Sequence, residues 1–521
     1  MPSRSGLSRR GFLTSVAAGT ALAALPLRSA SAAESVKILI IGSGYAGSVA
    51  ALRLAQAGLD SLVLERGRRW PITDQGGTFA TPAAPDGRAS WLNSWSPFVP
   101  QPLDVYPGVL EAFQANGVIA LAGAGVGGGS LVNNAVMLQP SQNVFKRAFG
   151  AHVDFDEMSD QWYTKARALI GMAPMPDDVY NSTHYTAARS FVAETTAAGL
   201  APFRADMAVD WQTVREEQAG TREASLIIAR SIWGANSGAK RSVDRTILAA
   251  AEATGRVSVE TLTRVVDVVP TNGHQRYLVR CERIDDTGAV VARPEYSAEH
   301  VFFAAGSLGT SRLLVAARDR GSLPALHATV GKGWGTNSDR QTVRVGMPWN
   351  NPTQGGPSGI VAQDLANPYE PVTLINFPWP RPPADGTGAL GALAMTTCSP
   401  DGHFTYDAAT DNVSLTWPST SPSALRATQA VTTTMDRINA ANPGTSTLRL
   451  NADTTSHTLG GVVLGQACKA DGRLYGYNNL YVIDSSLIPG SMATVPPALT
   501  VTALADRCVD LALRRILRNV P

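Results

Sequence analysis

The chain has 521 residues, of which 44% are hydrophobic and 17% charged, and its formal net charge is +2. This composition is typical of a globular protein and excludes an intrinsically disordered one. Because no stretch concentrates lysine and arginine, nucleic acid is not an expected partner, and the length predicts more than one domain.

The first 32 residues read as an export signal. Arg9 and Arg10 precede an apolar stretch over residues 12–27, and Ala30-Ser-Ala32 follows as a cleavage site. Paired arginines at this place are typical of twin-arginine export in bacteria. A frayed helix or a membrane anchor is less favoured, because about 16 residues fall short of the roughly 20 that a span needs. We therefore predict a secreted bacterial protein without a stable membrane span, whose net charge changes from +2 to −2 on cleavage.

Residues 36–65 are expected to form a β-α-β unit. The apolar run 36–41 predicts a buried parallel strand, and residues 48–57 predict a helix of small and aliphatic side chains. A second apolar run, 61–64, ends at Glu65. Between the first strand and the helix lies the sequence Gly-Ser-Gly-Tyr-Ala-Gly. This is the glycine fingerprint of dinucleotide binding in the context that it requires.

The fingerprint assigns a role to each glycine. Gly42 permits the tight turn, Gly44 lets the backbone approach a pyrophosphate, and Gly47 lets the helix pack on the strand. The helix N-terminus then faces the phosphate charge. Glu65 lies 23 residues after Gly42 and would accept hydrogen bonds from ribose hydroxyls, which favours FAD or NAD over NADP. The alternative is a glycine turn in an unrelated β-α-β unit.

A second glycine cluster has five glycines within residues 123–129. Such backbone can lie flat against a ligand and direct N–H groups at it. A flexible linker is the alternative, but apolar residues before the cluster, at 118–121, and after it, at 131–132, favour a folded and buried loop.

The four cysteines, Cys281, Cys398, Cys468 and Cys508, are widely separated in the sequence. No C-x-x-C motif occurs, so neither a zinc site nor an iron–sulfur site is expected, and no metal is predicted. Export would permit disulfides, but their spacing does not define a pairing. Buried free thiols are the expected state for most of them.

Four sequence blocks together carry a family resemblance. They contain Gly-Ser-Gly-Tyr-Ala-Gly-Ser in 36–66, Gly-Gly-Gly-Ser-Leu-Val-Asn in 121–134, Ala-Ala-Gly-Ser-Leu-Gly-Thr-Ser in 304–314, and His-Thr-Leu-Gly-Gly with later motifs in 455–508. In this order they resemble the glucose-methanol-choline flavoenzymes. Within that family they are most similar to the class with non-covalently bound FAD that includes the bacterial cholesterol oxidases.

The resemblance implies an α/β fold with two interleaved parts. One is a Rossmann-like FAD-binding domain, and the other is an α+β substrate domain that contains an antiparallel sheet. The expected division is residues 1–32 as the export signal, residues 33–155, 245–335 and 450–521 as the FAD-binding domain, and residues 156–244 and 336–449 as the substrate-binding domain.

The resemblance also implies which residues bind FAD, without a covalent link. Asp484 ends an apolar strand that contacts the ribityl chain and phosphates in the family, and the helix at 500–513 begins near the flavin pyrimidine. A helix N-terminus there would stabilise negative charge on reduced flavin. The full expected set is Gly42, Gly44, Tyr45, Ala46, Gly47, Glu65, Gly125, Gly128, Gly129, Ser130, Asn133, Ala305, Gly306, Asp484 and Pro497.

His457 is the expected catalytic residue. It opens the His-Thr-Leu-Gly-Gly motif, which in the family lies near flavin N5. Alcohol oxidation removes a hydroxyl proton and a hydride, and histidine suits proton exchange near neutral pH. The other six histidines, including His300 and His403, have no such context and are expected at the surface.

Two positions depart from the family pattern. Cholesterol oxidases carry a glutamate three residues before a Pro-x-Pro, and Ile375 stands at that place here, so glutamate-dependent steroid isomerisation is not expected. Where relatives have Asn or His beside the catalytic histidine, this chain has Pro496. The expected pocket is apolar, because Trp70, Trp91, Trp95 and Phe98 fall where the family has a lid. Its expected lining is Val136, Met137, Ile375, Phe377, Trp379 and Pro496.

These expectations describe a secreted FAD-dependent oxidoreductase that acts on the CH–OH group of a hydrophobic alcohol, sterol-like or other. O2 or another acceptor would reoxidise the flavin, and the protein would be a monomer or homodimer. The alternatives are an FAD dehydrogenase of a non-steroid secondary metabolite and a flavin- or lipid-binding homologue with altered catalysis.

Overall fold

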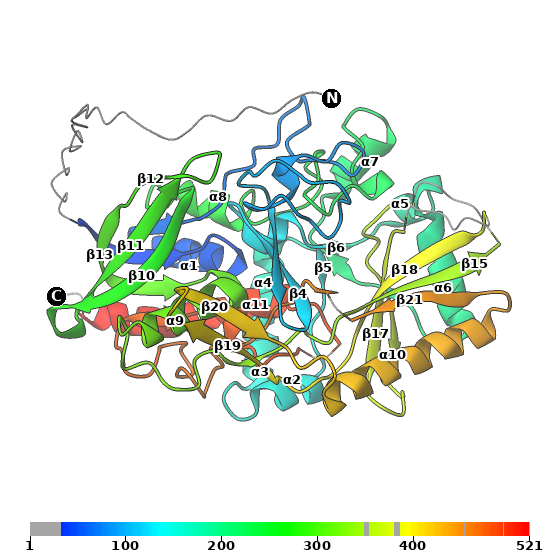
Figure 1. The fold of residues 1–521 in the computed structure, drawn as a ribbon. Helices are drawn as coiled ribbons and strands as arrows, with labels where there is room; N and C mark the ends of the chain where they lie inside the picture. The colour runs from blue at the N-terminus through cyan, green and yellow to red at the C-terminus, as the bar shows by residue number, and fades with distance from the viewer. Residues whose placement is uncertain (1–32, 349–353, 380–385, 453, 493, 520–521) are drawn as a thin grey trace, which may run out of the picture.

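The computed structural model describes residues 33–348, 354–379, 386–452, 454–492 and 494–519. The expected export signal therefore lies outside the described residues. Figure 1 shows two large sheets at opposite sides of the molecule, with β4 and α4 between them. In the described part of the chain, no helix is long and apolar enough to cross a membrane.

The first sheet has eight strands, in the order β10-β11-β13-β1-β2-β9, with β12 beside β11 and β23 beside β13. Strands β1, β2, β9, β13 and β23 are parallel. Except for Val36 and the two valines of β9, their apolar residues are buried, as expected where helices cover a parallel sheet. The strands are β1 (Glu34–Ile41), β2 (Ser61–Leu64), β9 (Val257–Glu260), β10 (Thr263–Thr271), β11 (Arg276–Ile284), β12 (Val290–Ala292), β13 (Glu295–Phe303) and β23 (Leu480–Val482).

Three helices pack near the parallel strands, and each begins close to a predicted motif. They are α1 (Tyr45–Gln56), α9 (Gly306–Asp319) and α11 (Ala498–Ile516). The expected β-α-β unit is confirmed, with the helix beginning three residues earlier than the pattern indicated because the glycine fingerprint enters its first turn. Helix α1 packs against both α11 and α8 (Ile247–Glu252), so the first and last parts of the chain share one core.

The second sheet has six strands, in the order β21-β15-β18-β17-β16-β7, and all of its pairs are antiparallel. Helix α10 (Pro422–Ala441) packs along it together with α6 (Thr186–Ala197) (Figure 1). The strands are β7 (Phe203–Arg204), β15 (Arg340–Met347), β16 (Ile360–Asp364), β17 (Val372–Phe377), β18 (Gly388–Met395) and β21 (Ser446–Asn451).

Three smaller sheets join these layers. The first contains β3 (Leu110–Ala115), β4 (Val118–Gly123) and β22 (Thr454–Thr455), and the second contains β5 (Val136–Met137), β6 (Ala173–Pro174) and β8 (Asp206–Met207). The third contains β14 (Lys332–Trp334), β19 (Gly402–Asp407) and β20 (Asn412–Thr416), and its hairpin packs on α9 rather than on the six-stranded sheet. The other helices are α2 (Gln142–Phe149), α3 (Phe155–Glu157), a π-helical turn η3 (Met158–Tyr163), α4 (Thr164–Ile170), α5 (Asp177–Tyr180) and α7 (Trp211–Gln218).

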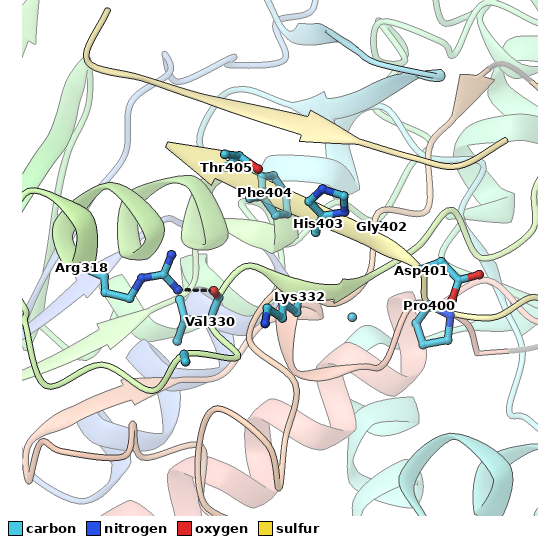
Figure 2. Close-up of a pocket in the computed structure, with 11 residues that line it drawn as sticks. Arg318, Val330, Lys332, Pro400, Asp401, Gly402, His403, Phe404 and Thr405 are labelled. Atoms are coloured by element: carbon cyan, nitrogen blue, oxygen red, sulfur yellow. Dashed lines mark hydrogen bonds between the residues drawn. The ribbon is translucent and has the colours of Figure 1, made fainter. Parts of the chain in front are cut away.

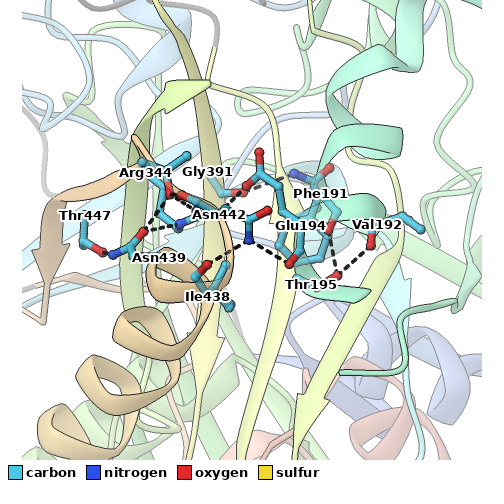
Figure 3. Close-up of polar contacts among 12 residues, drawn as sticks. Phe191, Val192, Glu194, Thr195, Arg344, Gly391, Ile438, Asn439, Asn442 and Thr447 are labelled. Atoms are coloured by element: carbon cyan, nitrogen blue, oxygen red, sulfur yellow. Dashed lines mark hydrogen bonds and ion pairs between the residues drawn. The ribbon is translucent and has the colours of Figure 1, made fainter. Parts of the chain in front are cut away.

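A buried ion pair ties the six-stranded sheet to its helices (Figure 3). Arg344 on β15 pairs with Glu194 on α6, and both residues are buried. The guanidinium also donates to Asn439 Oδ1 at 2.7 Å and to Thr445 Oγ1 at 2.5 Å. Burial alone disfavours both charges, because it raises the pKa of Glu194 and lowers that of Arg344. The hydrogen-bonded pair offsets that cost.

Replacing Glu194 with alanine should lower the free energy of unfolding by about 3–5 kcal/mol, because the Arg344 charge would stay buried without its partner. Denaturant unfolding measures this loss. The double variant Glu194→Leu/Arg344→Met removes both charges and should recover most of it. Asp178→Ala breaks an exposed pair with Arg215 and should change little. Equal losses in the Glu194 single and double variants would contradict this account.

Candidate active site

The first glycine motif forms a turn in which side chains have no room. A Cβ on Gly47 would lie 1.9 Å from the carbonyl oxygen of Gly42, and a Cβ on Gly42 would lie 2.5 Å from that of Ala304 on the neighbouring strand connection. Gly42 also has φ of +100°, which favours glycine. A Cβ on Gly44, in contrast, would meet only Gly128 Cα, at 3.9 Å. Gly44 therefore leaves open space at the start of α1.

Ser43 joins the two glycine loops to the predicted acidic residue. Its hydroxyl donates to Glu65 Oε2 at 2.6 Å, and its backbone N–H donates to the same oxygen. Gly127 N–H donates to the Ser43 hydroxyl at 3.2 Å. The other Glu65 oxygen accepts from Gly67 N–H at 2.9 Å. Oε2 accepts two of these bonds and Oε1 accepts one, so a second lone pair on Oε1 can still accept a ribose hydroxyl while these contacts fix the position of Glu65.

The second glycine cluster is a folded loop, as expected, and not a linker. Gly125, Gly127 and Gly128 all have positive φ, and a Cβ on Gly128 would lie 2.9 Å from Gly44 Cα. A Cβ on Gly129 would meet no atom within 4 Å. The two glycine loops thus lie against each other, and Gly129 borders open space.

The residues after the second loop secure it from both sides. Ser130 Oγ donates to Gly127 O at 2.7 Å and accepts from Val243 N–H at 3.0 Å. Asn133 Nδ2 donates to the hydroxyl of Tyr45, on the first turn of α1, at 2.9 Å. Two residues predicted from separate blocks therefore meet directly.

Asp484 anchors the third predicted block. One carboxylate oxygen accepts from Gly306 N–H at 2.9 Å and from Thr310 Oγ1 at 2.5 Å, and the other accepts from Ser486. Burial raises the pKa of Asp484, and these hydrogen bonds oppose that rise. The contacts hold the N-terminus of α9 beside the end of β23. Ala305, which precedes Gly306, is exposed there.

Three helices begin at predicted motifs without a side-chain cap: α1 after Gly44, α9 after Ala305 and α11 after Pro497. Helices α2, α4, α5, α6 and α8 also lack such a cap, so the position of the first three at the motifs is what distinguishes them. A helix N-terminus leaves backbone N–H groups free and carries partial positive charge. A ligand with phosphate groups can satisfy those donors.

Strand pairing places His457 next to the second glycine loop. Strand β22 runs parallel to β4, with Thr455 opposite Ala120. His457 follows β22 by two residues, and the second glycine loop follows β4 directly. Because parallel strands end at the same edge of a sheet, both segments emerge together. Beyond His457, Gly460 O accepts from Ser307 Oγ of α9 at 2.8 Å, which holds this loop beside the third block.

The imidazole of His457 has one hydrogen-bond partner among the described residues. Its Nδ1 lies 2.8 Å from Oδ1 of Asp339, at the start of β15. The Asp339 side chain is 1% exposed and that of His457 is 16% exposed. The imidazole is therefore held by a buried carboxylate and keeps a partly accessible face.

The predicted pocket residues come from three segments. Val136 and Met137 are buried on β5, shortly after the second glycine loop. Ile375 is buried on β17, in one row with Leu393 and Gln341 across three strands, and Gln341 lies two residues after Asp339. The remaining members are Phe377 and Trp379, whose rings meet edge-on with centroids 6.4 Å apart, and Pro496, which is buried.

Three residues of this region were missed by sequence reasoning. Ser43 is a variable position of the glycine motif, and only its small polar side chain hints at a role. Asn337 donates to Val495 O at 2.9 Å and accepts from Met492 N–H at 2.7 Å, so it holds the loop before Pro496. Asp339 lies 118 residues from His457 in the sequence, and no motif connects the two.

Family profiles match the chain in two parts. The N-terminal profile of the GMC oxidoreductases matches residues 36–318, and the C-terminal profile matches residues 409–505, so together they cover well over half of the chain. The chain belongs to the GMC oxidoreductase family. It is accordingly an FAD-dependent alcohol oxidoreductase, and the predicted family and fold class are confirmed.

Individual relatives of this GMC oxidoreductase cover nearly its whole length. A cholesterol oxidase of Mycobacterium tuberculosis is 26% identical over 91% of this chain and 90% of its own. A cholesterol oxidase of Acinetobacter baumannii is 24% identical over 91% of this chain and 93% of its own. Among solved structures, pyridoxine 4-oxidase from Mesorbium loti superposes with a TM-score of 0.64 at 17% identity, over 92% of this chain and 99% of that protein.

The residues of this GMC oxidoreductase fit FAD. The open space at Gly44 and Gly129 and the three uncapped helix N-termini suit a pyrophosphate and a flavin. In the described residues, two buried polar atoms also lack partners beside the second glycine loop. They are Trp70 Nε1, next to Gly125, and Asp244 Oδ1, next to Gly127.

Two further cavities lie outside the predicted site. One of about 420 Å³ is lined by residues of α9, β14 and β19, including Arg318, Lys332 and His403 (Figure 2). Its Arg318 is already bonded to Val330 O at 2.6 Å and to Asp319. The other, of about 330 Å³, includes Trp70 and Asp244. Apart from Trp70, which falls in the expected lid, neither lining includes a residue that we predicted to bind FAD or substrate.

Trp70, which falls in the expected lid, is part of a separate hydrophobic core cluster. It stacks on Phe79, with ring centroids 5.5 Å apart, in a core cluster of its own that also contains Trp233.

The cysteines agree with expectation, because Cys281, Cys468 and Cys508 are buried free thiols and Cys398 is a half-buried one.

The surface location expected for His300 is wrong. It lies on β13 beside β1, is buried, and its Nδ1 has no partner in the described residues. Burial lowers the pKa of His300 from 6.5 to about 4. The surface location was expected because no motif surrounds this histidine, whereas β13 lies between β11 and β1 in the sheet.

This burial predicts a loss of stability in mild acid. His300 stays neutral in the folded state but binds a proton in the unfolded chain below pH 6.5, so the free energy of unfolding should fall by about 3 kcal/mol between pH 6.5 and 4. Urea unfolding of His300→Leu should lack this part of the pH dependence. His403→Leu, at an exposed position, should retain it. An unchanged pH slope in His300→Leu would refute the assignment.

Proposed function

We propose that this GMC oxidoreductase oxidises the CH–OH group of a small hydrophobic alcohol, with His457 as the acid/base. The observation that carries the proposal is the partly accessible imidazole of His457, held by a buried carboxylate next to the second glycine loop. An imidazole so held can accept the hydroxyl proton near neutral pH.

The cofactor would be held without a covalent link by residues of the four sequence blocks. Gly44 and Tyr45 at the start of α1 would face the pyrophosphate, Glu65 the adenosine ribose, and Asn133 and Pro497 the flavin side. Bound FAD supplies the two-electron oxidation by accepting the hydride at N5. The protein contributes orientation of the alcohol, transfer of its hydroxyl proton and exclusion of water.

The alcohol would be recognised by apolar contacts. Ile375 is buried and its neighbours Leu374, Asn376 and Phe377 carry no acid, so this segment offers no group that could move a double bond by proton transfer. We therefore propose oxidation without steroid isomerisation. Asn376, the polar neighbour of Ile375, has an amide that cannot act as a carboxylate base. It is also already engaged, because its Oδ1 accepts from Ser358 Oγ at 2.8 Å and its Nδ2 donates to Gly391 O.

We propose that one large sheet binds the cofactor and the other binds the substrate. The eight-stranded sheet with α1, α9 and α11 would bind FAD, and the six-stranded sheet with α10 would bind substrate. Segments 33–155, 245–335 and 450–521 would form the first part, and 156–244 and 336–449 the second. We further propose that residues 1–32 direct twin-arginine export, that the mature protein is secreted, and that O2 or another acceptor reoxidises the flavin.

Anaerobic mixing of the FAD-loaded enzyme with a panel of alcohols tests the proposal. A hydrophobic substrate alcohol should bleach the flavin absorption band, and product analysis should give the ketone or aldehyde. From a 5-ene sterol, the product should keep its double bond in place. Tight binding of hydrophobic alcohols without bleaching would instead identify a binding homologue. Bleaching by polar alcohols alone would overturn the proposed substrate class.

A further inference from the structure

The carboxylate of Asp339 is placed where it can fix the protonation of His457. Its Oδ1 lies 2.8 Å from Nδ1 of the imidazole. Its Oδ2 accepts from Ser456 N–H at 3.2 Å and from Thr455 Oγ1 at 2.9 Å. The two oxygens thus have separate tasks, one directed to the imidazole and one to the chain that precedes it.

A constrained turn delivers Asp339 to this point. Asn337 and Ser338, the two residues before it, have φ of +51° and +54°, which is unfavourable for residues other than glycine. The turn is tied down by Asn337 N–H, which donates to Gly490 O at 3.1 Å, and by paired backbone bonds between Gly335 and Leu459. Backbone strain held in this way persists only where surrounding contacts determine it.

Pro496, the residue where relatives have Asn or His beside the catalytic histidine, cannot replace this carboxylate as a partner of His457. Proline has no backbone N–H and no polar side-chain atom, so Pro496 cannot hydrogen-bond an imidazole through its side chain. The nearest cation to Asp339 along the chain, Arg340, donates to Ala424 O and Thr428 Oγ1 on α10 and to the backbone carbonyl of Asp339, not to its carboxylate. Among the described residues, Asp339 and His457 are therefore each other's ionisable side-chain partner.

We infer that Asp339 is the positioning residue of this active site and fixes His457 in the Nδ1–H tautomer, with the Nε2 lone pair directed to the substrate hydroxyl. The inference rests on the proposed function of His457. A carboxylate can only accept at Oδ1, so neutral His457 must donate from Nδ1 and leave Nε2 unprotonated.

With this tautomer, the proton and the hydride removed from the alcohol each have an acceptor. The hydroxyl O–H bond breaks and its proton goes to Nε2, while the C–H electron pair leaves as hydride to the cofactor and a C=O bond forms. The imidazolium produced is stabilised by the Asp339 charge 2.8 Å away in a buried setting, where such a contact is stronger than in water. Asp339 itself keeps its charge and touches neither alcohol nor cofactor.

The variant Asp339→Asn tests this inference because it should reverse the tautomer. The amide oxygen is needed at the Oδ2 position to accept from Ser456 N–H, so the NH2 group must face His457 Nδ1. That nitrogen must then accept, and the proton moves to Nε2. We expect ¹⁵N-histidine NMR of the FAD-loaded protein to show Nδ1 protonated in wild type and Nε2 protonated in the variant, with His457→Gln assigning the signals.

The rate of flavin reduction by a substrate alcohol should fall at least 100-fold in Asp339→Asn, while the unfolding midpoint changes little. Asp364→Asn is the matched control, because Asp364 is also buried and bonded but lies away from His457, and it should leave the His457 signals unchanged. A wild-type imidazole protonated at Nε2 would overturn the inference even if the variant did not fold. An unchanged tautomer in Asp339→Asn would overturn it as well.

The two proposals fail separately. If no alcohol bleaches the flavin but the tautomer reverses as expected, the substrate assignment is wrong and the positioning role stands. If alcohols bleach the flavin but the wild-type imidazole is protonated at Nε2, the oxidase function stands and Asp339 is a structural residue of the turn.

Discussion

Replacing His457 with glutamine is expected to slow anaerobic flavin reduction by about 10²–10⁴-fold while FAD stays bound. Glutamine can still donate a hydrogen bond to the buried Asp339 carboxylate, so the turn should keep its shape, but it cannot take up the hydroxyl proton. Stopped-flow absorbance measures the reduction rate, and the flavin spectrum after gel filtration measures cofactor retention.

The matched control is His403→Gln, at an exposed position on β19, which should reduce flavin at the wild-type rate. Undiminished reduction in His457→Gln would show that another group accepts the proton. A general loss of FAD in that variant would show that the histidine supports the cofactor loop rather than the reaction.

Alanine substitutions at Gly44 and Gly47, two glycines of one motif, are expected to have different effects. Gly44→Ala should weaken FAD binding by about 100-fold, or roughly 3 kcal/mol, yet leave the apoprotein folded. Its φ of −67° is ordinary for alanine, and the new Cβ would meet no protein atom closer than 3.9 Å. The methyl group would instead occupy the space that we assign to the pyrophosphate. FAD titration of the apoprotein and its thermal unfolding measure the two effects.

Gly47→Ala is the comparison, since its Cβ would lie 1.9 Å from Gly42 O. The helix must then move away from the strand, and we expect loss of the folded protein rather than of FAD affinity alone. Normal FAD affinity in Gly44→Ala would mean that the cofactor does not pass this point. A stable, FAD-loaded Gly47→Ala would mean that the packing of α1 on β1 is looser than its contacts indicate.

The parts of the site that follow one another in the chain were predictable. The apolar run before Gly42, the glycines themselves and Glu65 lie within one β-α-β unit, where strand, turn and helix impose a fixed spacing. His457 was predicted from its motif. Its partner was not, because Asp339 reaches it only through the pairing of β22 with β4 and through a turn between two other strands. Contacts of that kind depend on tertiary packing, which local sequence patterns do not encode.

For His300, the location predicted from the sequence was itself wrong. This histidine was expected at the surface because it lies in no motif, yet β13 has neighbours on both sides in the eight-stranded sheet. Burial there is decided by the order of strands in the sheet, and that order is set by segments from residue 34 to residue 482.

The same strand order has a consequence for how the enzyme is made. Around the proposed cofactor site, Gly42 near the beginning of the chain lies against Ala304, Gly306 donates to Asp484 near the end, and β23 completes the sheet beside β13. Such long-range pairing forms late in folding. The ribosome must therefore release nearly the whole chain before the site can close around FAD, so cofactor loading should be the last step of folding and should report that folding is complete.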